Sequence, residues 1–224
     1  MPRNEGERES ISELTTGRLS VYLRCLNYLE SVNQKTVSSH ELAERFHLNS
    51  AQIRKDLACF GEFGTRGVGY DVCKLKRHLV HALGIDQTRN VIIIGAGNLG
   101  MALADYHGFN SSGFHIAAML DTDPGKIGRR SRTGIPVVPF AQLHEVVASN
   151  SVEIGIIAVT ADSAQEVYDA LVEAGIHAIL NFAPTQLRLR DDVKVKSVDL
   201  RINLESLSFY LKNSEEPEDT AETG

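Results

Sequence analysis

Val91-Ile92-Ile93-Ile94-Gly95-Ala96-Gly97-Asn98-Leu99-Gly100 is the stretch of sequence that decides the predicted fold. Four β-branched apolar residues in a row are typical of a central parallel strand that is buried on both faces. In the G-x-G-x-x-G pattern that follows, we expect a tight turn at Gly95, close approach of a pyrophosphate to the backbone at Gly97, and close packing of the next helix at Gly100. That helix, over residues 99–106, would direct the free N–H groups at its start toward phosphates.

A second predicted strand, residues 115–120, favours dinucleotide binding because it ends in an acid. Asp121 follows Gly100 by twenty-one residues, where a dinucleotide-binding fold has the carboxylate that accepts hydrogen bonds from the adenosine ribose. This carboxylate would repel a 2′-phosphate, so we expect NAD(H), although Lys126, Arg129 and Arg130 are cations that could hold such a phosphate. A tight strand-to-helix turn without a ligand is the alternative for the whole motif.

The rest of the second half alternates predicted strands and helices. Strands are expected at residues 136–138, 153–159 and 176–180, and helices at residues 141–148 and, capped by Asp162 and Gln165, up to Ala174. This pattern predicts a doubly wound parallel sheet, which binds ligands beyond the carboxyl ends of its strands. Thr160 and Asn181-Phe182-Ala183 end strands and are expected near the nicotinamide half of the cofactor. For Phe182, ordinary core packing is an equal alternative.

Composition excludes several classes of protein. No apolar run among the 224 residues approaches the roughly 20 needed to cross a bilayer, and the first ten residues are polar, so we expect a cytoplasmic protein without a membrane partner. The three cysteines lack C-x-x-C spacing and the eight histidines are scattered, so no metal site is predicted.

Charge is distributed unevenly along the chain. Residues 14–81 contain ten Lys or Arg and six Asp or Glu, whereas residues 91–224 contain ten and eighteen. The first segment is therefore suited to a polyanion that the second would repel. Residues 1–13 and the acidic residues 213–224 are expected to be disordered.

The basic segment has the pattern of a helix-turn-helix. A helix is predicted at residues 19–29, a second after the capping box Ser38–Glu41, and a third over residues 50–60, capped by Asn49 with Gln52. On the third helix, Ile53, Leu57 and Phe60 form the inward stripe. Arg54 and Lys55 lie on the opposite side with Ala51 and Ala58, where a helix in a major groove needs small residues and cations.

A glycine-rich segment follows this third helix. Residues 61–70 contain four glycines, as expected of a β-hairpin wing with Arg66 near its tip, from where the arginine could enter a minor groove. We therefore interpret residues 14–85 as a winged-helix DNA-binding domain. A solvated surface helix is the alternative for Arg54 and Lys55 taken alone. The candidate DNA-contacting residues are Ser50, Gln52, Arg54, Lys55 and Arg66.

Several separated motifs together resemble the Rex family of redox-sensing transcriptional repressors, bacterial proteins that respond to the balance of NADH and NAD. The motifs are Arg18-Leu19, Tyr22-Leu23-Arg24, Val37-Ser38-Ser39, Gln52-Ile53-Arg54-Lys55-Asp56, Gly64-Thr65-Arg66-Gly67-Val68-Gly69-Tyr70, the Gly95 to Gly100 loop, Gly128-Arg129, Asn181-Phe182-Ala183-Pro184 and Val198-Asp199-Leu200. The chain departs from the family at Ala58-Cys59, where Ser-Tyr is usual, and at Thr160-Ala161, where Pro-Ala is usual.

This resemblance implies a repressor, not an enzyme, that binds palindromic double-stranded operator DNA as a homodimer and is released by NADH. It implies that residues 86–199 form a Rossmann-like NAD(H)-binding domain, and that Arg18, Tyr106 and Asp199 are switch residues near the subunit interface. The residues then expected at the cofactor are Gly95, Ala96, Gly97, Asn98, Leu99, Gly100, Asp121, Thr122, Lys126, Thr160, Asn181, Phe182 and Ala183. A small NAD-dependent dehydrogenase and a CoA- or nucleotide-binding module are the rival classes.

The last predicted helix, residues 200–212, is unusually apolar. Leu200, Leu204, Leu207 and Leu211 recur at helical spacing, and Phe209 with Tyr210 widens the apolar surface. From the pattern alone, packing on its own sheet and packing on a partner are equal alternatives. The family resemblance implies a dimerisation helix that crosses to the other subunit.

Overall fold

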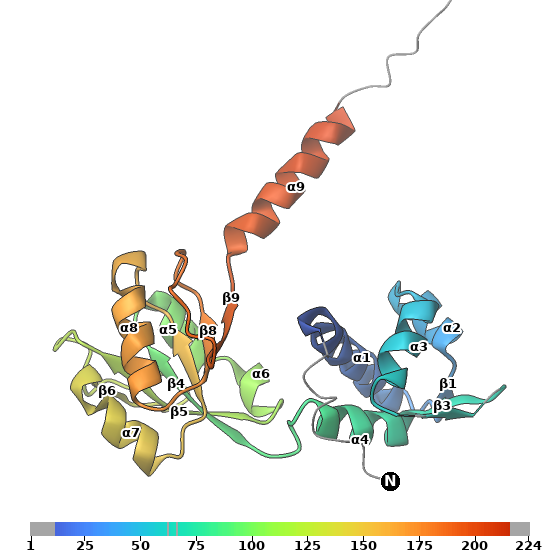
Figure 1. Cartoon of the computed structure of the whole chain (residues 1–224), viewed down its shortest axis with the longest axis horizontal. Helices are drawn as coiled ribbons and strands as arrows, with labels where there is room; N and C mark the ends of the chain where they lie inside the picture. The colour runs from blue at the N-terminus through green and yellow to red at the C-terminus, as the bar shows by residue number, and fades with distance from the viewer. Residues whose placement is uncertain (1–11, 62, 66, 216–224) are drawn as a thin grey trace, which may run out of the picture. The chain divides into compact units, whose positions relative to one another are not determined.

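The structure is a computed structural model that describes residues 12–61, 63–65 and 67–215. The chain separates into two compact units, Met1–Gln87 and Thr88–Gly224, and each is described by itself (Figure 1). Arg66, most of the arm at residues 1–13 and most of the acidic tail lie outside the described residues. Ser12 and Glu13 already belong to the start of the first helix, and the last helix extends to Glu215.

The first unit is built from helices and a small antiparallel sheet. The sheet has the order β1-β3-β2, with β3 between its two neighbours. Its elements are α1 (Glu13–Ser31), β1 (Thr36–Val37), α2 (Ser39–Phe46), α3 (Ser50–Ala58), β2 (Gly64–Thr65), β3 (Gly69–Asp71) and α4 (Val72–Ala82).

Side-chain caps begin both helices of the helix-turn-helix, α2 and α3. Ser38 Oγ accepts the backbone N–H of Glu41, while a Glu41 carboxylate oxygen accepts the N–H of Ser38, so the predicted capping box is confirmed. His47 ends α2 in the left-handed region at φ 53°, and Asn49 Oδ1 then accepts the N–H of Gln52 to start α3. A core of buried side chains from α1, α2, α3 and α4 holds these helices together.

The second unit contains a six-stranded parallel sheet of order β6-β5-β4-β7-β8-β9. The chain runs outward from β4 in one direction, returns, and runs outward in the other, as in a dinucleotide-binding fold. Its elements are β4 (Arg89–Ile94), α5 (Asn98–Ala104), α6 (His107–Asn110), β5 (Phe114–Asp121), β6 (Val137–Pro139), η2 (Phe140–Gln142), α7 (Leu143–Ser149), β7 (Ile154–Ile157), α8 (Ala161–Glu173), β8 (Ala178–Asn181), β9 (Lys194–Ser197) and α9 (Leu200–Glu215).

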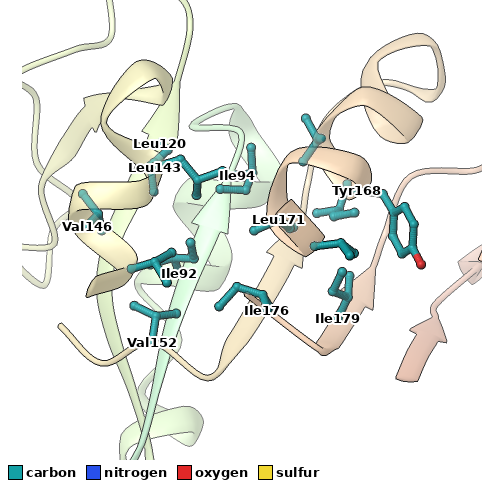
Figure 2. Packing of buried hydrophobic residues seen from close by; sticks show 14 of the residues in the cluster. Ile92, Ile94, Leu120, Leu143, Val146, Val152, Tyr168, Leu171, Ile176 and Ile179 are labelled. Atoms are coloured by element: carbon teal, nitrogen blue, oxygen red, sulfur yellow. The ribbon is translucent and has the colours of Figure 1, made fainter. Parts of the chain in front are cut away.

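Alternate residues of β4 face opposite sides of the sheet. Ile92 and Ile94 pack with residues of α7 and α8 (Figure 2), whereas Val91 and Ile93 pack in a second cluster with residues of α5 and α6. Helices therefore cover both faces, and the run of β-branched residues is buried on both sides as predicted.

The differences from the sequence predictions include three details of the second unit. The helix after the glycine-rich loop ends at Ala104 rather than at Tyr106, which instead precedes α6. Asp162 and Gln165 do not cap α8, because the cap position is Thr160 and Gln165 bonds to Asp169 and Arg188. Strand β9 was not predicted, since Lys194-Val195-Lys196-Ser197 is a short edge strand with lysines that lacks an apolar run.

Helix α9 differs from the other long helices in having no buried face. Every residue from Leu200 to Lys212 is exposed, although these residues include seven large apolar side chains, at 59–67% exposure. Packing of this helix on its own sheet, one of the two alternatives from the sequence, is therefore not what the structure shows.

Candidate functional site

The glycine-rich loop joins β4 to α5 at the point where the sheet reverses direction. Gly95 has φ 106°, and a Cβ there would lie 2.5 Å from the carbonyl oxygen of Ala158 on the neighbouring crossover. A Cβ at Gly100 would lie 1.8 Å from the carbonyl oxygen of Gly95. Both positions therefore require glycine for the chain's own packing.

Gly97 is a different case. Its φ of −80° is open to any residue, and a Cβ there would meet no other described atom within 4 Å, its chain neighbours aside. Packing inside the protein therefore does not explain this glycine. A ligand that approaches the backbone closely does explain it, which is the role that the sequence pattern predicts for Gly97.

Asp121, at the end of β5, is tied to the same loop. Its carboxylate is 9% exposed and accepts hydrogen bonds from the N–H of Ala96 at 2.8 Å, the N–H of Asp123 at 2.9 Å and the Lys126 ammonium at 3.0 Å. Burial raises the pKa of Asp121, but the bonds from Asp123, Lys126 and Ala96 outweigh that effect, so the pKa is lowered. The acid is ionised and braces the loop, a role that sequence reasoning missed.

A pocket of about 230 Å³ opens beside this loop. Met101 and Val137 provide apolar walls, while Lys126 and Arg129 bring two cations. Apolar walls with a few convergent polar groups suit a heteroaromatic base that is attached to anionic groups. The lining consists of Ala96, Gly97, Asn98, Met101, Lys126, Arg129 and Val137.

The remaining candidates, Leu99 on α5 and several residues at strand ends, divide into exposed and buried residues. Leu99, Thr122 and Thr160 are exposed. Asn181 is fully buried, where its Oδ1 accepts the N–H of Ala183 at 2.9 Å and its Nδ2 donates to the carbonyl oxygen of Ala183 at 3.2 Å. Asn181 and the buried Ala183 thus shape the turn after β8.

Phe182 lies in that turn and is partly buried. It packs against the cluster that contains Ile93, which agrees with the core alternative, and part of its surface remains accessible. The position of Phe182 is therefore compatible with both core packing and contact with the cofactor.

The three residues expected at an interface have partners inside their own units. The Tyr106 ring is 60% exposed and packs edge-on against Phe109, with the ring centroids 5.1 Å apart. Asp199 pairs with Arg201 at 2.9 Å, and this hydrogen bond lowers the pKa of Asp199. Arg18 pairs with Asp56 on α3.

Helix α3 presents a basic outer face in the first unit. Arg54 and Lys55 are exposed, and Arg54 Nη1 donates to Ser39 Oγ on α2 at 3.0 Å. Ser50 and Gln52, in the first turn of α3, are partly exposed. A helix that follows a tight turn and carries small residues and cations on its open face has the features of a major-groove reader. The wing candidate Arg66 lies outside the described residues.

Asp56 is the residue that sequence reasoning missed on this helix. It is 2% exposed and receives four hydrogen bonds, two from Arg18 and one each from Tyr22 and Gln52. The bond from Arg18 is the main reason that the pKa of Asp56 falls to about 2. The sequence does contain a signal for this role. Asp56 adjoins Leu57 of the inward-facing apolar stripe, and a carboxylate that is buried there needs a charged partner.

Two features are absent from the described residues. No cluster of three or more His, Cys, Asp or Glu side chains could hold a metal ion. None of the described helices is long and apolar enough to cross a bilayer.

Comparisons with known proteins match both units of the chain. A family model described as a CoA binding domain matches residues 86–185, and one described as a putative DNA-binding protein N-terminus matches residues 10–58. The redox-sensing transcriptional repressor Rex of Carboxydothermus hydrogenoformans is 52% identical over 202 residues, which cover 90% of this chain and 97% of that protein. Rex of Streptomyces coelicolor is 48% identical over 200 residues, which cover 89% and 77%.

Solved structures show the same similarity. The crystal structure of RSP in complex with β-NAD⁺ and operator DNA has a TM-score of 0.86 and 40% identity, and the match covers 92% of this chain and 94% of that one. The structure of RSP with β-NADH has a TM-score of 0.83 and 39% identity, covering 92% and 96%.

Proposed function

Because this chain belongs to the Rex family of redox-sensing transcriptional repressors, we propose that it binds palindromic operator DNA as a homodimer and releases that DNA when NADH occupies the site at the glycine-rich loop. Its relatives are repressors rather than enzymes, although the parallel sheet belongs to a fold that many enzymes use. The relatives are bacterial regulators, and the proposed partner of this chain is DNA. The cytoplasmic location expected from the sequence is therefore part of this proposal.

The observation that carries the cofactor assignment is the open space over Gly97. The two other glycines of the loop are required by the chain's own packing, whereas Gly97 is not. NAD(H) is a ligand whose pyrophosphate needs such an approach, and RSP has been crystallised with both β-NAD⁺ and β-NADH. When bound, the cofactor supplies a nicotinamide ring that carries a positive charge only in the oxidised form.

Individual side chains have separate roles in this proposal. Asp121 holds the loop and faces the adenosine ribose, Lys126 neutralises part of that carboxylate, and Met101 with Val137 flanks the base. Near the other end, Thr160 is exposed after β7 and Phe182 offers a partly accessible apolar surface. An apolar contact of this kind accepts an uncharged ring more readily than a cationic one, which gives the chain a means to distinguish NADH from NAD⁺.

The DNA contacts are assigned to α3 and the hairpin that follows it. Arg54 and Lys55 would bind phosphates or guanine edges in a major groove, with Ser50 and Gln52 near the base edges and Arg66 in the adjacent minor groove. A dimer places two such helices on half-sites about one helical turn, or a multiple of it, apart. The exposed apolar side chains of α9 support the dimer, because a helix of this kind requires a partner surface.

Regulation then follows from linkage between the two sites. If NADH favours a dimer geometry in which the recognition helices no longer match the half-sites, it weakens DNA binding, and DNA weakens NADH binding by the same factor. Couplings of roughly 1–3 kcal/mol, or 5- to 150-fold in affinity, are typical of such systems.

The test uses DNA fragments bound by the full chain in gel shifts, with NADH or NAD⁺ added at saturation. We expect NADH to release the DNA and NAD⁺ to release much less. Equal release by the two forms would overturn redox sensing even if both bind at the loop. Competition of NADH by coenzyme A would instead favour the rival class that the CoA-binding family model suggests, and turnover of NADH with candidate substrates would favour a dehydrogenase.

A matched pair of glycine variants tests the cofactor site itself. Gly97→Ala should fold normally and bind NADH more weakly, because its new methyl group meets the ligand and no described protein atom. Gly100→Ala should lose stability, because its methyl group would collide with the backbone of Gly95. Unchanged NADH affinity in Gly97→Ala would contradict the assignment.

A further inference from the structure

The carboxylate of Asp56 is bonded at both oxygens. Its Oδ2 accepts hydrogen bonds from Arg18 Nε at 2.6 Å and from the Tyr22 hydroxyl at 2.8 Å. Its Oδ1 accepts from Arg18 Nη2 at 2.7 Å and from Gln52 Nε2 at 2.8 Å. A carboxylate has about four acceptor positions, so all of them are used and the side chain of Asp56 is held in one orientation.

This arrangement fixes the polarity of the Gln52 amide. An ionised carboxylate accepts hydrogen bonds and donates none, so Gln52 must direct its NH₂ group toward Asp56. A flipped amide would bring the oxygen of Gln52 against the oxygen of Asp56, which is unfavourable for two acceptors in a partly buried position. The carbonyl oxygen Oε1 of Gln52 therefore points away from Asp56.

Gln52 also lies at a position on α3 where the orientation of its amide can affect base recognition. It is the third residue of the helix, in the first turn, and it is partly exposed while Asp56, one turn later, is buried. Residues in the first turn of a recognition helix are those that reach base edges in the major groove. The four bases differ there in whether they present an amino donor or a carbonyl acceptor.

We propose that Asp56 is a specificity-determining positioning residue that makes Gln52 present a hydrogen-bond acceptor to the major groove. Gln52 then selects a base that presents its amino group in the major groove, adenine or cytosine, over guanine or thymine at one position of each half-site. Asp56 does not touch DNA and acts through the amide of Gln52. This inference rests on the proposed role of α3 as the recognition helix.

The test begins with an operator selected by the full chain from a duplex library with randomised half-sites. Binding of that operator and of its single base-pair variants is then measured by fluorescence anisotropy. In the unmodified chain, replacing the base that Gln52 contacts by guanine or thymine should weaken binding at least about fivefold.

Asp56→Asn is the decisive variant. Arg18 donates to both oxygens of Asp56, through Nε to Oδ2 and through Nη2 to Oδ1, so neither orientation of the introduced amide satisfies every donor, and the side chain no longer requires Gln52 to donate. Gln52 can then present either end of its amide outward, so the preference at this one position should weaken and guanine or thymine should be accepted. Preferences at the other positions should stay as they were, a pattern that a general loss of stability does not produce.

Two further variants keep the proposal testable if Asp56→Asn folds poorly. Gln52→Ala should abolish the preference at that position, and adding Asp56→Asn to Gln52→Ala should not change base preference further. Tyr22→Phe is the matched control, because it removes a hydrogen bond from Oδ2 and leaves the Gln52 contact at Oδ1 in place, so base preference should be retained.

Failure of this inference can be told apart from failure of the proposed function. If Gln52→Ala keeps the original base preference at every position while Arg54→Ala and Lys55→Ala weaken binding, α3 is the recognition helix but Asp56 does not set its specificity. If none of these variants affects operator binding, the assignment of α3 itself is wrong.

Discussion

The carboxylate of Asp121 accepts a hydrogen bond from the backbone N–H of Ala96 at 2.8 Å, so the acid at the end of β5 holds the glycine-rich loop at the end of β4. These two residues are 25 positions apart in sequence. Asp121 therefore affects ligand binding in two ways, through the ribose that it is expected to contact and through the shape of the loop.

We expect Asp121→Ala to weaken NADH binding by roughly 1–2 kcal/mol, the scale of hydrogen bonds to a charged group. The variant should also reduce the difference in affinity between NADH and NADPH. Calorimetry is the appropriate measurement, since the chain contains no tryptophan as a fluorescent reporter. Asp123→Ala is the matched control, because Asp123 is exposed and its side chain accepts the N–H of Gly125. Unchanged affinity in Asp121→Ala would count against the site.

Sequence reasoning found the loop, the acid and both caps of the helix-turn-helix because each is a local pattern with a single geometric solution. Gly95 needs a positive φ, and Ser38 with Glu41 closes its hydrogen bonds within one turn. Asp56 was missed because its partners Arg18 and Tyr22 are 38 and 34 residues away, and only the packing of α1 against α3 brings them together. The spacing of residues along the chain therefore does not predict that contact.

For α9, too, the sequence pattern does not identify the surface on which the helix packs. Its apolar pattern indicates that a surface must cover it, but the pattern is the same whether that surface belongs to its own sheet or to a partner. The exposure of every residue from Leu200 to Lys212 removes the first alternative.

The basic face of α3 gives a prediction on salt dependence. Arg54→Ala and Lys55→Ala should each lower operator affinity, and each lost phosphate contact should reduce the slope of log affinity against log salt concentration by about 1. Anisotropy titrations over a range of salt concentrations measure both quantities. Lys194→Ala removes a cation from β9 in the second unit and should leave the slope unchanged. Full operator binding by the double variant at Arg54 and Lys55 would contradict the assignment.

The exposed face of α9 gives a prediction on assembly. Deleting residues 200–224 should yield monomer or aggregate, because Leu204, Leu207 and Leu211, which are proposed to pack on the partner subunit, are lost with the helix. Light scattering coupled to size-exclusion chromatography measures the mass. Deleting only residues 216–224 is the control and should preserve the dimer. A soluble dimer that binds DNA without residues 200–224 would refute the role of this helix.

The ion pair between Arg18 and the buried Asp56 gives a prediction on pH. The pKa of Asp56 is about 2 in the folded chain and about 4 in an unfolded one, so the folded state binds fewer protons as pH falls through this range. The resulting stability, roughly 2 kcal/mol, is present above the unfolded value and is lost as pH falls from about 4 to about 2.

Urea unfolding followed by circular dichroism at several pH values tests this expectation. Asp56→Asn should lower the free energy of unfolding at neutral pH and flatten its decline in acid. Asp162→Asn, at an exposed position on α8, is the control and should retain the decline. Equal acid sensitivity in Asp56→Asn and the unmodified chain would show that this carboxylate is not responsible.

The last prediction concerns the coupling between cofactor and DNA. Tyr106→Phe keeps the ring that packs on Phe109 and removes only the hydroxyl. Asp199→Ala removes the carboxylate that pairs with Arg201 in the first turn of α9. If these groups switch the dimer between two geometries, each variant should leave operator affinity largely intact and shrink the 5- to 150-fold change that NADH is expected to cause. The ratio of operator affinities with and without saturating NADH measures this change. Asp192→Ala breaks a comparable pair with Arg190, 3.0 Å apart, and should retain the full NADH effect. An undiminished ratio in both Tyr106→Phe and Asp199→Ala would remove these residues from the switch, because linkage requires that a group carrying the coupling contribute different interactions in the two states.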